Sequence, residues 1–461
     1  MATHQSKESP AQAGRRDTIA AIATPSGRGG IGVIRLSGPE SYTIARGITH
    51  REPEPRIAHY CQFYDSQGRE IDQGILIYYP SPGSYTGEDV IEFQGHGGPM
   101  VLGMLLQAVI AAGARQAEPG EFTERAFLND KIDLLQAEAV ADLINSVSEQ
   151  AARSALRSLQ GEFSRRISTL QEELTSLRVF IEGALDFPDE EIDLIADMDI
   201  SGRLNNLQEQ ISRLLTEAKT GSKLREGLRT VIIGRPNVGK SSLLNRLTGY
   251  DRAIVTEIAG TTRDVIEDTL VVGGININIV DTAGLRVAQG IVEKEGIRRS
   301  VSEINKADIV ILVTDSPEIT DQELSILKEH KISSDKLIVA HNKADLYQEQ
   351  PPLDQADKTK HIYLSAKTGE GVARLQESLL ALSGIGNTGE DAVLARERHI
   401  KAIEEAMNII TESKQDFDLT SRTELLAESL RRTQMELSRV TGDLTPDDLL
   451  TEIFSKFCIG K

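Results

Sequence analysis

The sequence contains few cysteines and no long apolar run, and each shortage excludes a class of protein. Only Cys61 and Cys458 occur among 461 residues, and neither belongs to a metal-ligand spacing. We therefore expect a reducing cytoplasmic setting without structural disulfides or zinc. No apolar run approaches the ~18 residues that a membrane span needs. The first residues also lack the apolar core of a signal peptide.

Basic residues are also scarce relative to acidic ones. The chain has 51 Lys and Arg against 70 Asp and Glu, a formal net charge of −19. A surface of this sign repels phosphate backbones. If the chain acts on a nucleic acid, we expect a partner to supply much of the basic surface. The length is that of about three domains.

Four short stretches, taken in order, predict a guanine-nucleotide site. The first, Gly234-Arg-Pro-Asn-Val-Gly-Lys-Ser241, fits the Walker A pattern. In that pattern backbone N–H groups surround the α- and β-phosphates, Lys240 reaches the β- and γ-phosphates, and the Ser241 hydroxyl holds Mg²⁺. Residues 228–233 are typical of a strand and those from Ser242 onward of a helix, so the phosphates would lie at a helix N-terminus.

The second stretch is Asp281-Thr-Ala-Gly284. It closes a predicted strand at 275–280, which the Gly273-Gly274 pair joins as a hairpin to a strand at 266–272. This arrangement would place Asp281 beside Mg²⁺ and the Gly284 N–H near the γ-phosphate, where loss of that phosphate can be sensed.

The third and fourth stretches are Asn342-Lys-Ala-Asp345, after the apolar run 337–341, and Ser365-Ala-Lys367. Asp345 can accept hydrogen bonds from both N1–H and the exocyclic amine of guanine, which adenine cannot offer. Taken alone, each later stretch is better explained as a plain strand-to-loop junction. Their order and spacing favour the nucleotide site.

The segment between the first two stretches predicts a switch. Gly260-Thr-Thr-Arg-Asp264 lies where Ras-type domains keep the threonine that completes the Mg²⁺ shell, and we assign Thr262 to that role. Leu285 stands where Ras-like enzymes carry the glutamine that orients the attacking water. Because an apolar side chain cannot do this, hydrolysis must recruit another group.

Apolar periodicity predicts helices on both sides of this nucleotide cassette. Three stripes repeat every three or four positions: Leu156, Leu159, Phe163, Ile167, Leu170, Leu174, Leu177, Ile181 and Leu185; Leu204, Leu207, Ile211, Leu214 and Ala218; and Ile403, Met407, Ile410, Leu426, Leu430, Leu437 and Val440. The simplest partners are one another, which makes the cassette an insertion in a helical domain. An intermolecular coiled coil is the alternative.

The remaining segments give weaker signals. Residues 1–16 are typical of a disordered tail, and 17–131 of a compact α+β domain with strands at 33–36, 74–79 and 90–93. The acidic run 186–193 suits a solvated helix break better than a metal site. Two further features have open interpretations. The glycine run 27–32 is an anion-binding nest or a tight turn, and His96 is an acid, a base or an ordinary turn residue.

Besides the nucleotide motifs, four stretches are distinctive: Asp17-Thr-Ile-Ala-Ala-Ile-Ala-Thr-Pro-Ser-Gly-Arg-Gly-Gly-Ile-Gly32, Phe93-Gln-Gly-His-Gly-Gly98, Pro119-Gly-Glu-Phe-Thr-Glu-Arg-Ala-Phe-Leu-Asn-Asp-Lys131 and Phe457-Cys-Ile-Gly-Lys461. With these stretches the chain closely resembles the MnmE (TrmE) family of tRNA-modification GTPases over nearly its whole length. The resemblance implies a multidomain α+β and α/β protein. We expect a folate-binding-like dimerisation domain at 17–131, a discontinuous helical domain at 132–225 and 384–461, and an inserted Ras-like P-loop GTPase domain at 226–383.

The resemblance also implies the hydrolysis chemistry. In this family a K⁺ ion, held at the positions of Asn237, Thr256, Ile258 and Thr261, takes the place of an arginine finger. Glu293 would position the attacking water. The complete set of expected GTP-binding residues is Asn237, Val238, Gly239, Lys240, Ser241, Ser242, Thr256, Glu257, Ile258, Ala259, Gly260, Thr261, Thr262, Asp281, Thr282, Ala283, Gly284, Asn342, Lys343, Asp345, Ser365, Ala366 and Lys367.

For the N-terminal domain, the resemblance implies a 5-formyl- or 5,10-methylene-tetrahydrofolate bound by Arg35, Glu92, Lys131 and Lys461. A carboxylate suits the pterin N–H groups, and the cations suit the glutamate tail or carbonyl oxygens. Each residue alone would be better explained as a surface ion. Cys458 invites a nucleophile hypothesis. Against it, residues 454–457 suit apolar anchoring, and free cysteines are commonly buried small hydrophobes.

The expected function is therefore a K⁺- and Mg²⁺-dependent GTPase that works as a homodimer with the flavoprotein MnmG (GidA), which brings FAD and NADH. The pair would add an aminomethyl or carboxymethylaminomethyl group to C5 of the wobble uridine of certain tRNAs, while GTP hydrolysis drives rearrangement. The rival hypothesis is a GTP-dependent assembly or signalling factor whose N-terminal domain only binds partners.

Overall fold

The computed structural model describes residues 17–186, 199–250, 267–281, 303–347, 360–384, 392–442, 447–455 and 457–460. The expected tail at 1–16 and nearly all of the acidic run 186–193 lie outside these residues. The described chain forms two compact units. One contains the chain up to Glu138 and again from Thr441, and the other is Ala139–Val440. The helix α4 (Leu134–Ile144) passes from the first unit into the second.

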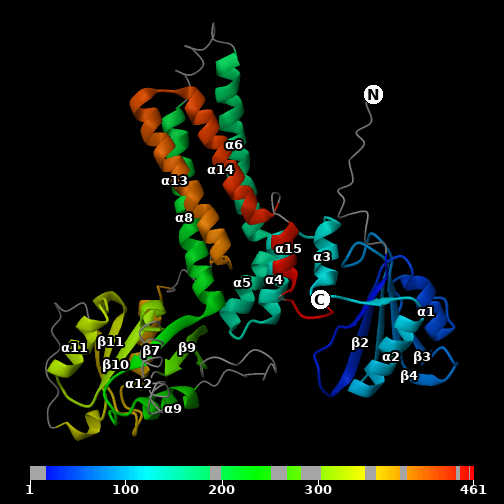
Figure 1. Ribbon diagram of the computed structural model, residues 1–461, viewed down its shortest axis with the longest axis horizontal. Coiled ribbons are helices and arrows are strands. Elements are labelled where there is room, and N and C mark those ends of the chain that lie inside the picture. The colour runs from blue at the N-terminus through cyan, green and yellow to red at the C-terminus, as the bar shows by residue number, and fades with distance from the viewer. Residues whose placement is uncertain are drawn as a thin grey trace, which may run out of the picture. The chain divides into compact units, whose positions relative to one another are not determined.

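The first unit is built on a six-stranded sheet (Figure 1). Alternate residues of its strand β1 enter two cores: Ala20 packs with residues of α1 and α2, while Ile19 and Ala21 pack with Phe122 of α3. Helices α1 and α2 therefore cover one face of the sheet, and α3 packs on the other face at β1. Its order is β3-β4-β5-β2-β1-β6, with β1 (Ile19–Ile22), β2 (Gly29–Ser37), β3 (His59–Tyr64), β4 (Glu70–Tyr79), β5 (Val90–Gly97), β6 (Arg115–Gln116), α1 (Ser41–Thr49), α2 (Pro99–Ala111) and α3 (Glu121–Leu128).

The end of the chain packs on this first unit. The helix α15 (Asp447–Ser455) contacts α3, and Phe454 lies 6.3 Å from Phe127 between ring centroids. Phe454 and Phe457 are buried, so the expected apolar anchoring is confirmed. Ile459 pairs with Pro119 in an isolated β-bridge. Contacts therefore group residues from Thr441 onward with the N-terminal unit, whereas the family resemblance implied that they belong to the helical domain.

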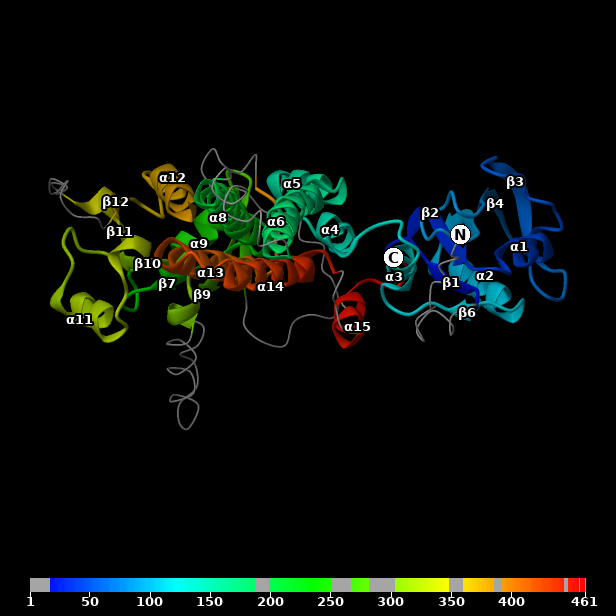
Figure 2. The same ribbon diagram turned by 90° about the horizontal axis from the view of Figure 1, so that it is seen from above.

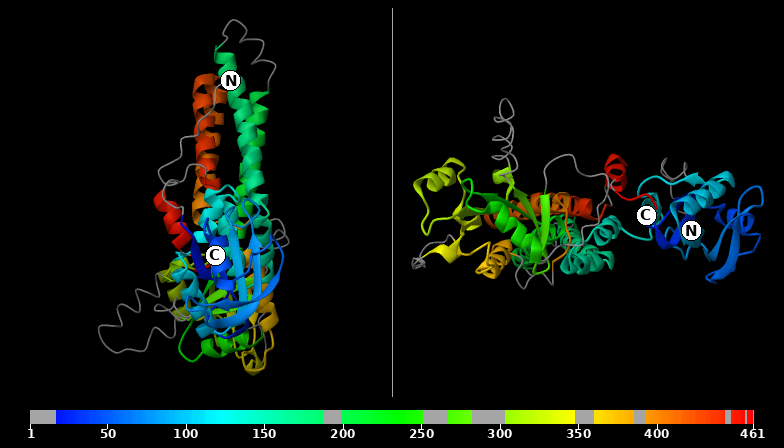
Figure 3. Two further views of the ribbon diagram at one scale, coloured as in Figure 1. Left: turned by 90° about the vertical axis from the view of Figure 1, so that its right-hand side faces the viewer. Right: turned by 90° about the horizontal axis from the view of Figure 1, so that it is seen from below.

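Four long helices of the second unit pack side by side (Figures 1 and 2). They are α6 (Glu162–Asp186), α8 (Ile200–Glu226), α13 (Glu397–Thr420) and α14 (Thr423–Thr441). Side-chain hydrogen bonds join α6 to α14 and α8 to α13, through Gln171–Ser438 and Gln208–Thr411. Figure 3 shows the orange and red helices running alongside the green ones. The prediction that the stripes pack on one another is confirmed.

The first apolar stripe, from Leu156 to Leu185, predicts one long helix, and this prediction is wrong. The helix α5 (Glu149–Leu159) ends before Gly161, whose φ of +78° is left-handed, and α6 starts at Glu162. A left-handed glycine terminates a helix at little steric cost. Leu156 is consequently 45% exposed rather than part of the buried stripe.

A second six-stranded sheet lies between α8 and α13 in sequence. Its order is β12-β11-β10-β7-β9-β8, and all neighbours are parallel except the β8–β9 hairpin. Gly273 and Gly274, both with positive φ, form the hairpin turn as predicted. The elements are β7 (Leu228–Ile233), α9 (Lys240–Tyr250), β8 (Glu267–Val272), β9 (Ile275–Asp281), β10 (Ile309–Thr314), α11 (Asp321–Glu329), η2 (Ser334–Lys336), β11 (Leu337–His341), η3 (Ala344–Leu346), β12 (Lys360–Tyr363) and α12 (Val372–Ser383). Among the described helices, none combines the length and apolarity of a membrane span.

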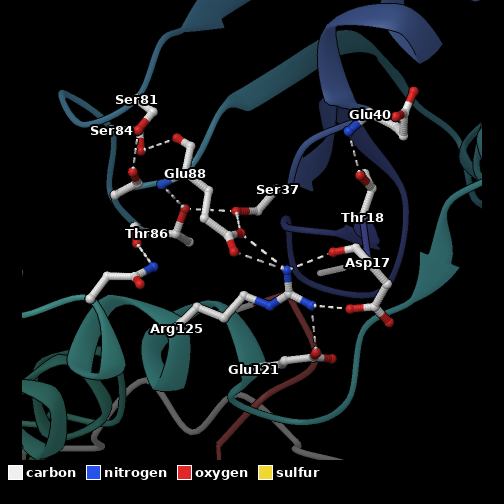
Figure 4. Close-up of polar contacts among 12 residues, drawn as sticks. Asp17, Thr18, Ser37, Glu40, Ser81, Ser84, Thr86, Glu88, Glu121 and Arg125 are labelled. Atoms are coloured by element: carbon white, nitrogen blue, oxygen red, sulfur yellow. Dashed lines mark hydrogen bonds and ion pairs between the residues drawn. The ribbon is translucent and has the colours of Figure 1, made fainter. Parts of the chain in front are cut away.

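A buried arginine connects three parts of the first unit, and sequence reasoning did not predict it. Arg125 of α3 is 3% exposed and pairs with Asp17, Glu88 and Glu121 at 2.8, 3.1 and 3.0 Å. Figure 4 shows Ser37 and Thr86 continuing this network from Glu88. A helix, the chain before β1 and the loop before β5 therefore share one cluster of charges.

Replacing Arg125 by methionine is expected to destabilise the first unit by about 3 kcal/mol, because buried acids lose a partner. Urea unfolding followed by circular dichroism measures this change. The control is Arg69→Met, which breaks an exposed pair with Asp65 and should cost less than about 1 kcal/mol. Equal effects of the two substitutions would contradict the importance of the buried cluster.

Acid should weaken the same cluster. A hydrogen bond from Arg115 is the main cause that lowers the pKa of Asp17. Burial raises the pKa of Glu121, but hydrogen bonds from Arg115, the Glu118 N–H and Arg125 lower it by more, so the net pKa is lowered. Because both folded-state pKa values are lowered, the stabilisation is complete above the ordinary carboxyl range and is lost as the pH falls from that range through the lowered folded-state pKa values. Arg125→Met should flatten this acid dependence.

Candidate functional site

The first motif forms a tight loop between β7 and α9. Gly234, Asn237 and Gly239 have φ values of +146°, +63° and +99°. A Cβ on Gly234 would lie 2.2 Å from the Val313 carbonyl oxygen, and one on Gly239 would lie 2.2 Å from Asn342 Nδ2. Side chains at these two glycines would therefore clash with neighbouring strand ends. The loop is packed against the edge of the sheet where the other motifs begin.

Two side chains at the start of α9 have the properties that phosphate and Mg²⁺ require. Lys240 Nζ donates to the carbonyl oxygens of Gly234 and Arg235 at 2.9 and 2.7 Å. The ammonium is thus held over the phosphate loop. Ser241 is exposed in the first helical turn. Asp281 ends β9 beside β7, where its backbone pairs with Ile232.

Asn342 joins three of the four motifs. It is 3% exposed, its Nδ2 donates to the Val238 carbonyl oxygen at 2.7 Å, and its Oδ1 accepts from the Ala366 N–H at 2.9 Å. Lys343 Nζ donates to the Asn237 carbonyl oxygen at 3.1 Å. The phosphate loop, the Asn342–Asp345 stretch and the Ser365–Lys367 stretch therefore meet at the carboxyl ends of β7, β11 and β12.

The edge of this cluster carries an exposed carboxylate, that of Asp345, which can contact a nucleotide base. Asp345 is exposed in η3, whereas Ser365 is fully buried and orders the turn by accepting from the Thr368 N–H at 3.2 Å. Val238, Ser242 and Lys367 complete the described part of the predicted set. An exposed carboxylate at this position can accept hydrogen bonds from the N1–H and the exocyclic amine of guanine.

Sequence reasoning missed two residues of this region. Arg246 of α9 donates from Nε to the Ala366 carbonyl oxygen at 3.0 Å and from Nη2 to the Lys367 carbonyl oxygen. His341 contacts the Ser316 carbonyl oxygen through Nδ1 at 2.8 Å and His361 through Nε2 at 3.0 Å. Burial lowers the pKa of His341. Neither residue belongs to a sequence motif, because both contact residues that are far away along the chain.

In the first unit, two of the four expected folate residues are in contact. Arg35 and Glu92 face each other across β2 and β5, with Nε and Nη2 at 2.9 and 2.8 Å from Glu92 Oε1. Their side chains keep 21% and 15% exposure. Lys131 instead donates to the Pro82 carbonyl oxygen at 3.0 Å. Lys461 lies outside the described residues. The preceding residue, Gly460, lies close to the end of β1, since a Cβ on Gly460 would be 2.4 Å from the Ile22 carbonyl oxygen.

The two open features of this unit have specific structures. Gly29 and the later glycines of the run belong to strand β2, and only Gly27 has a positive φ. The run is therefore neither a nest nor simply a turn. His96 contacts Asp72 through Nδ1 at 2.8 Å, and its backbone N–H donates to the other carboxylate oxygen. Cys458 is exposed, and its carbonyl oxygen accepts from the Gly120 N–H at 3.4 Å.

Comparisons with known proteins identify the family. Residues 18–131 match the model of the GTP-binding protein TrmE N-terminus, and residues 134–458 match the MnmE helical domain. The tRNA modification GTPase MnmE of Hydrogenovibrio crunogenus is 48% identical over 96% of this chain and 99% of the relative. Those of Pseudomonas paraeruginosa and Coxiella burnetii are each 51% identical over the same shares. The chain belongs to the MnmE family of tRNA modification GTPases.

Membership of the MnmE family agrees with the fold class expected from the sequence. An α+β N-terminal part, a discontinuous helical part and a P-loop sheet are all present. GTP and Mg²⁺ are the ligands of P-loop GTPases. Among solved structures, the G domain of the T. maritima FeoB iron transporter is 28% identical over 34% of this chain, with a TM-score of 0.26. A score of this size supports no structural argument.

Several predicted site residues lie outside the described residues or have only their backbone described. Asp281 has a described backbone but no described side chain. The residues outside the description are Thr256, Glu257, Ile258, Ala259, Gly260, Thr261, Thr262, Thr282, Ala283, Gly284, Glu293 and Lys461. Their roles stay predictions.

Proposed function

We propose that this chain is a K⁺-dependent GTPase that acts with the flavoprotein MnmG to modify C5 of the wobble uridine of certain tRNAs. The observation that supports it most is the meeting of the three described nucleotide motifs around Asn342, in a chain that also carries the N-terminal Arg35–Glu92 pair. One part suits guanine-nucleotide chemistry and the other suits a polar cofactor. GTP hydrolysis would drive rearrangement rather than supply carbon.

The cation proposal starts from Asn237. Its side chain is exposed in the phosphate loop, and among the described residues no hydrogen bond to its carboxamide is present. A free amide oxygen in the loop that would hold the phosphates suits a hard cation. Thr256, Ile258 and Thr261 would complete the K⁺ site, while Ser241 and Thr262 would hold Mg²⁺. K⁺ would offset the charge that develops between the β- and γ-phosphates, and Glu293 would position the water.

The folate proposal starts from the Arg35–Glu92 pair. The pair is partly exposed, and the Arg35 guanidinium carbon lies 5.9 Å from the ring centre of Phe122. A preformed and partly exposed ion pair suits the polar edge of a heterocycle such as a pterin. We propose that Arg35, Glu92, Lys131 and Lys461 bind 5-formyl- or 5,10-methylene-tetrahydrofolate as the one-carbon donor.

Partners follow from charge and from family membership. With a net charge of −19, this chain is poorly suited to gripping tRNA alone, so we propose that MnmG supplies basic surface as well as FAD and NADH. We also propose a homodimer.

Exposed Cys458 lies on the first unit, and a nucleophilic role for its thiolate is part of the proposal. If the Cys458→Ser variant still supports full tRNA modification, the nucleophilic role of Cys458 is wrong.

Equilibrium binding of labelled 5-formyltetrahydrofolate tests the proposed function at the N-terminal unit. We expect saturable binding by the full chain and at least about tenfold weaker binding by Arg35→Ala, since a charged hydrogen bond contributes about 1.5–3 kcal/mol. The matched control is Arg51→Ala, which removes an exposed arginine bonded to the Tyr60 carbonyl oxygen. Absence of saturable binding would favour a GTP-dependent assembly or signalling factor instead.

A further inference from the structure

A chain of alternating charges runs from α11 across the phosphate loop to the Asn342–Asp345 stretch. Arg235, the second residue of the phosphate loop, places Nε 3.3 Å from Glu323 Oε1 and Nη2 3.3 Å from Asp315 Oδ1. The other oxygen of Asp315 accepts from Lys343 Nζ at 2.8 Å. None of the nucleotide motifs includes Asp315 or Glu323.

One end of this chain is fixed in the protein interior. Glu323 is fully buried, and its Oε2 accepts from the backbone N–H and the hydroxyl of Thr320 at 2.9 and 2.8 Å. The bond from the Thr320 N–H is part of the capping box of α11. A buried carboxylate with this many partners is immobile, so it can hold Arg235 in one place.

The other end joins two loops whose backbones are conformationally costly. Lys343 Nζ also donates to the Asn237 carbonyl oxygen. Asn237 and Lys343 have φ values of +63° and +60°, which non-glycine residues rarely adopt without support from their surroundings. The Lys343 ammonium thus joins Lys343 to Asn237, two residues with strained backbones, and Asp315 is its counter-ion.

We propose that Asp315 is a positioning residue of the nucleotide site. By holding Arg235 and Lys343 together, it keeps the phosphate loop and the guanine-binding loop in the shape that receives nucleotide. Glu323 anchors this arrangement from α11. The inference rests on the proposed guanine-nucleotide binding and deepens it. Asp315 follows directly after β10, so its position is set by the central part of the sheet.

This role has a kinetic signature. Because Asp315 acts by shaping the free site, its loss should weaken GDP and GTP equally and leave the chemical step unchanged. Asp315→Ala is expected to raise the Kd for fluorescent GDP and the KM for GTP by about tenfold each, the scale of one lost charge-assisted hydrogen bond. The kcat for GTP should stay within about twofold, and Asp315→Glu should recover part of the affinity.

Fluorescence titration with labelled GDP, together with GTP turnover by the full chain, tests the inference. Glu329→Gln, an exposed acid at the end of α11, is the matched control for Glu323→Gln, which should weaken GDP binding in the same direction as Asp315→Ala. If Asp315→Ala does not fold, the nearly isosteric Asp315→Asn carries the same comparison. A folded Asp315 variant with wild-type GDP affinity, or one that loses kcat at unchanged KM, would overturn the positioning role. A wild-type chain that binds no GDP would instead overturn the proposed function.

Discussion

Asn237→Ala is expected to lower kcat for GTP hydrolysis by about 10²-fold, on the scale of one lost preorganised electrostatic contact, and to abolish any preference for KCl over NaCl. The exposed Asn237 carboxamide is the described part of the proposed cation site. Without it the cation is no longer fixed where charge develops during cleavage. The measurement is GTP turnover in KCl and in NaCl at equal ionic strength, with nucleotide at saturation.

Two comparisons make this result specific. Asn206→Ala, at an exposed asparagine of α8, should keep both the rate and the KCl preference. GDP binding by Asn237→Ala should persist, since Asn342 and Lys240 still form the loop contacts. Equal wild-type turnover in the two salts would rule out Asn237 as a K⁺ ligand.

Asp345→Asn is expected to weaken GTP binding by about 10²-fold or more, because two hydrogen bonds to a charged acceptor are lost and an amide donor faces the guanine amine. The same change should allow xanthosine triphosphate to bind, since xanthine has a carbonyl where guanine has the amine. Competition between the two nucleotides for a fluorescent analogue measures both shifts.

The control for this exchange is Asp321→Asn, at an exposed acid in the first turn of α11. It should leave the preference for guanine unchanged. Retained discrimination in a folded Asp345→Asn variant would show that another group reads the base, and the interpretation of the Asn342–Asp345 stretch would then be wrong.

The sequence predicted those elements whose signals are local. The strand before the phosphate loop, the helix after it and the glycine hairpin each follow from residues within a few positions. The break at Gly161 was missed because the apolar period continues through it, while the left-handed φ that ends α5 leaves no periodic trace.

Long-range contacts could not be predicted in this way. Arg125 pairs with Asp17, which is 108 positions away, and Arg235 with Glu323, which is 88 positions away. Nothing in a charged residue identifies its partner at such separations. The same holds for the packing of Phe454 near Phe127, which joins the end of the chain to the N-terminal unit.

Family resemblance extended the prediction beyond these local signals, to residues that periodicity does not mark. Arg35 and Glu92 lie in different strands and look like ordinary surface ions, yet β2 and β5 pair them directly. Lys131 was expected in the same set, and its described contact is with the Pro82 carbonyl oxygen. The sequence therefore identified candidate residues, while the sheet register shows which of them meet.

The central claim is that this chain uses GTP hydrolysis to modify the wobble uridine of tRNA. Nucleoside analysis by liquid chromatography and mass spectrometry of tRNA from cells lacking the chain tests it most directly. The account predicts loss of C5-aminomethyl-type uridines, with restoration by the wild-type chain but not by Asn237→Ala. Wild-type amounts of these nucleosides in the deletion strain would contradict it.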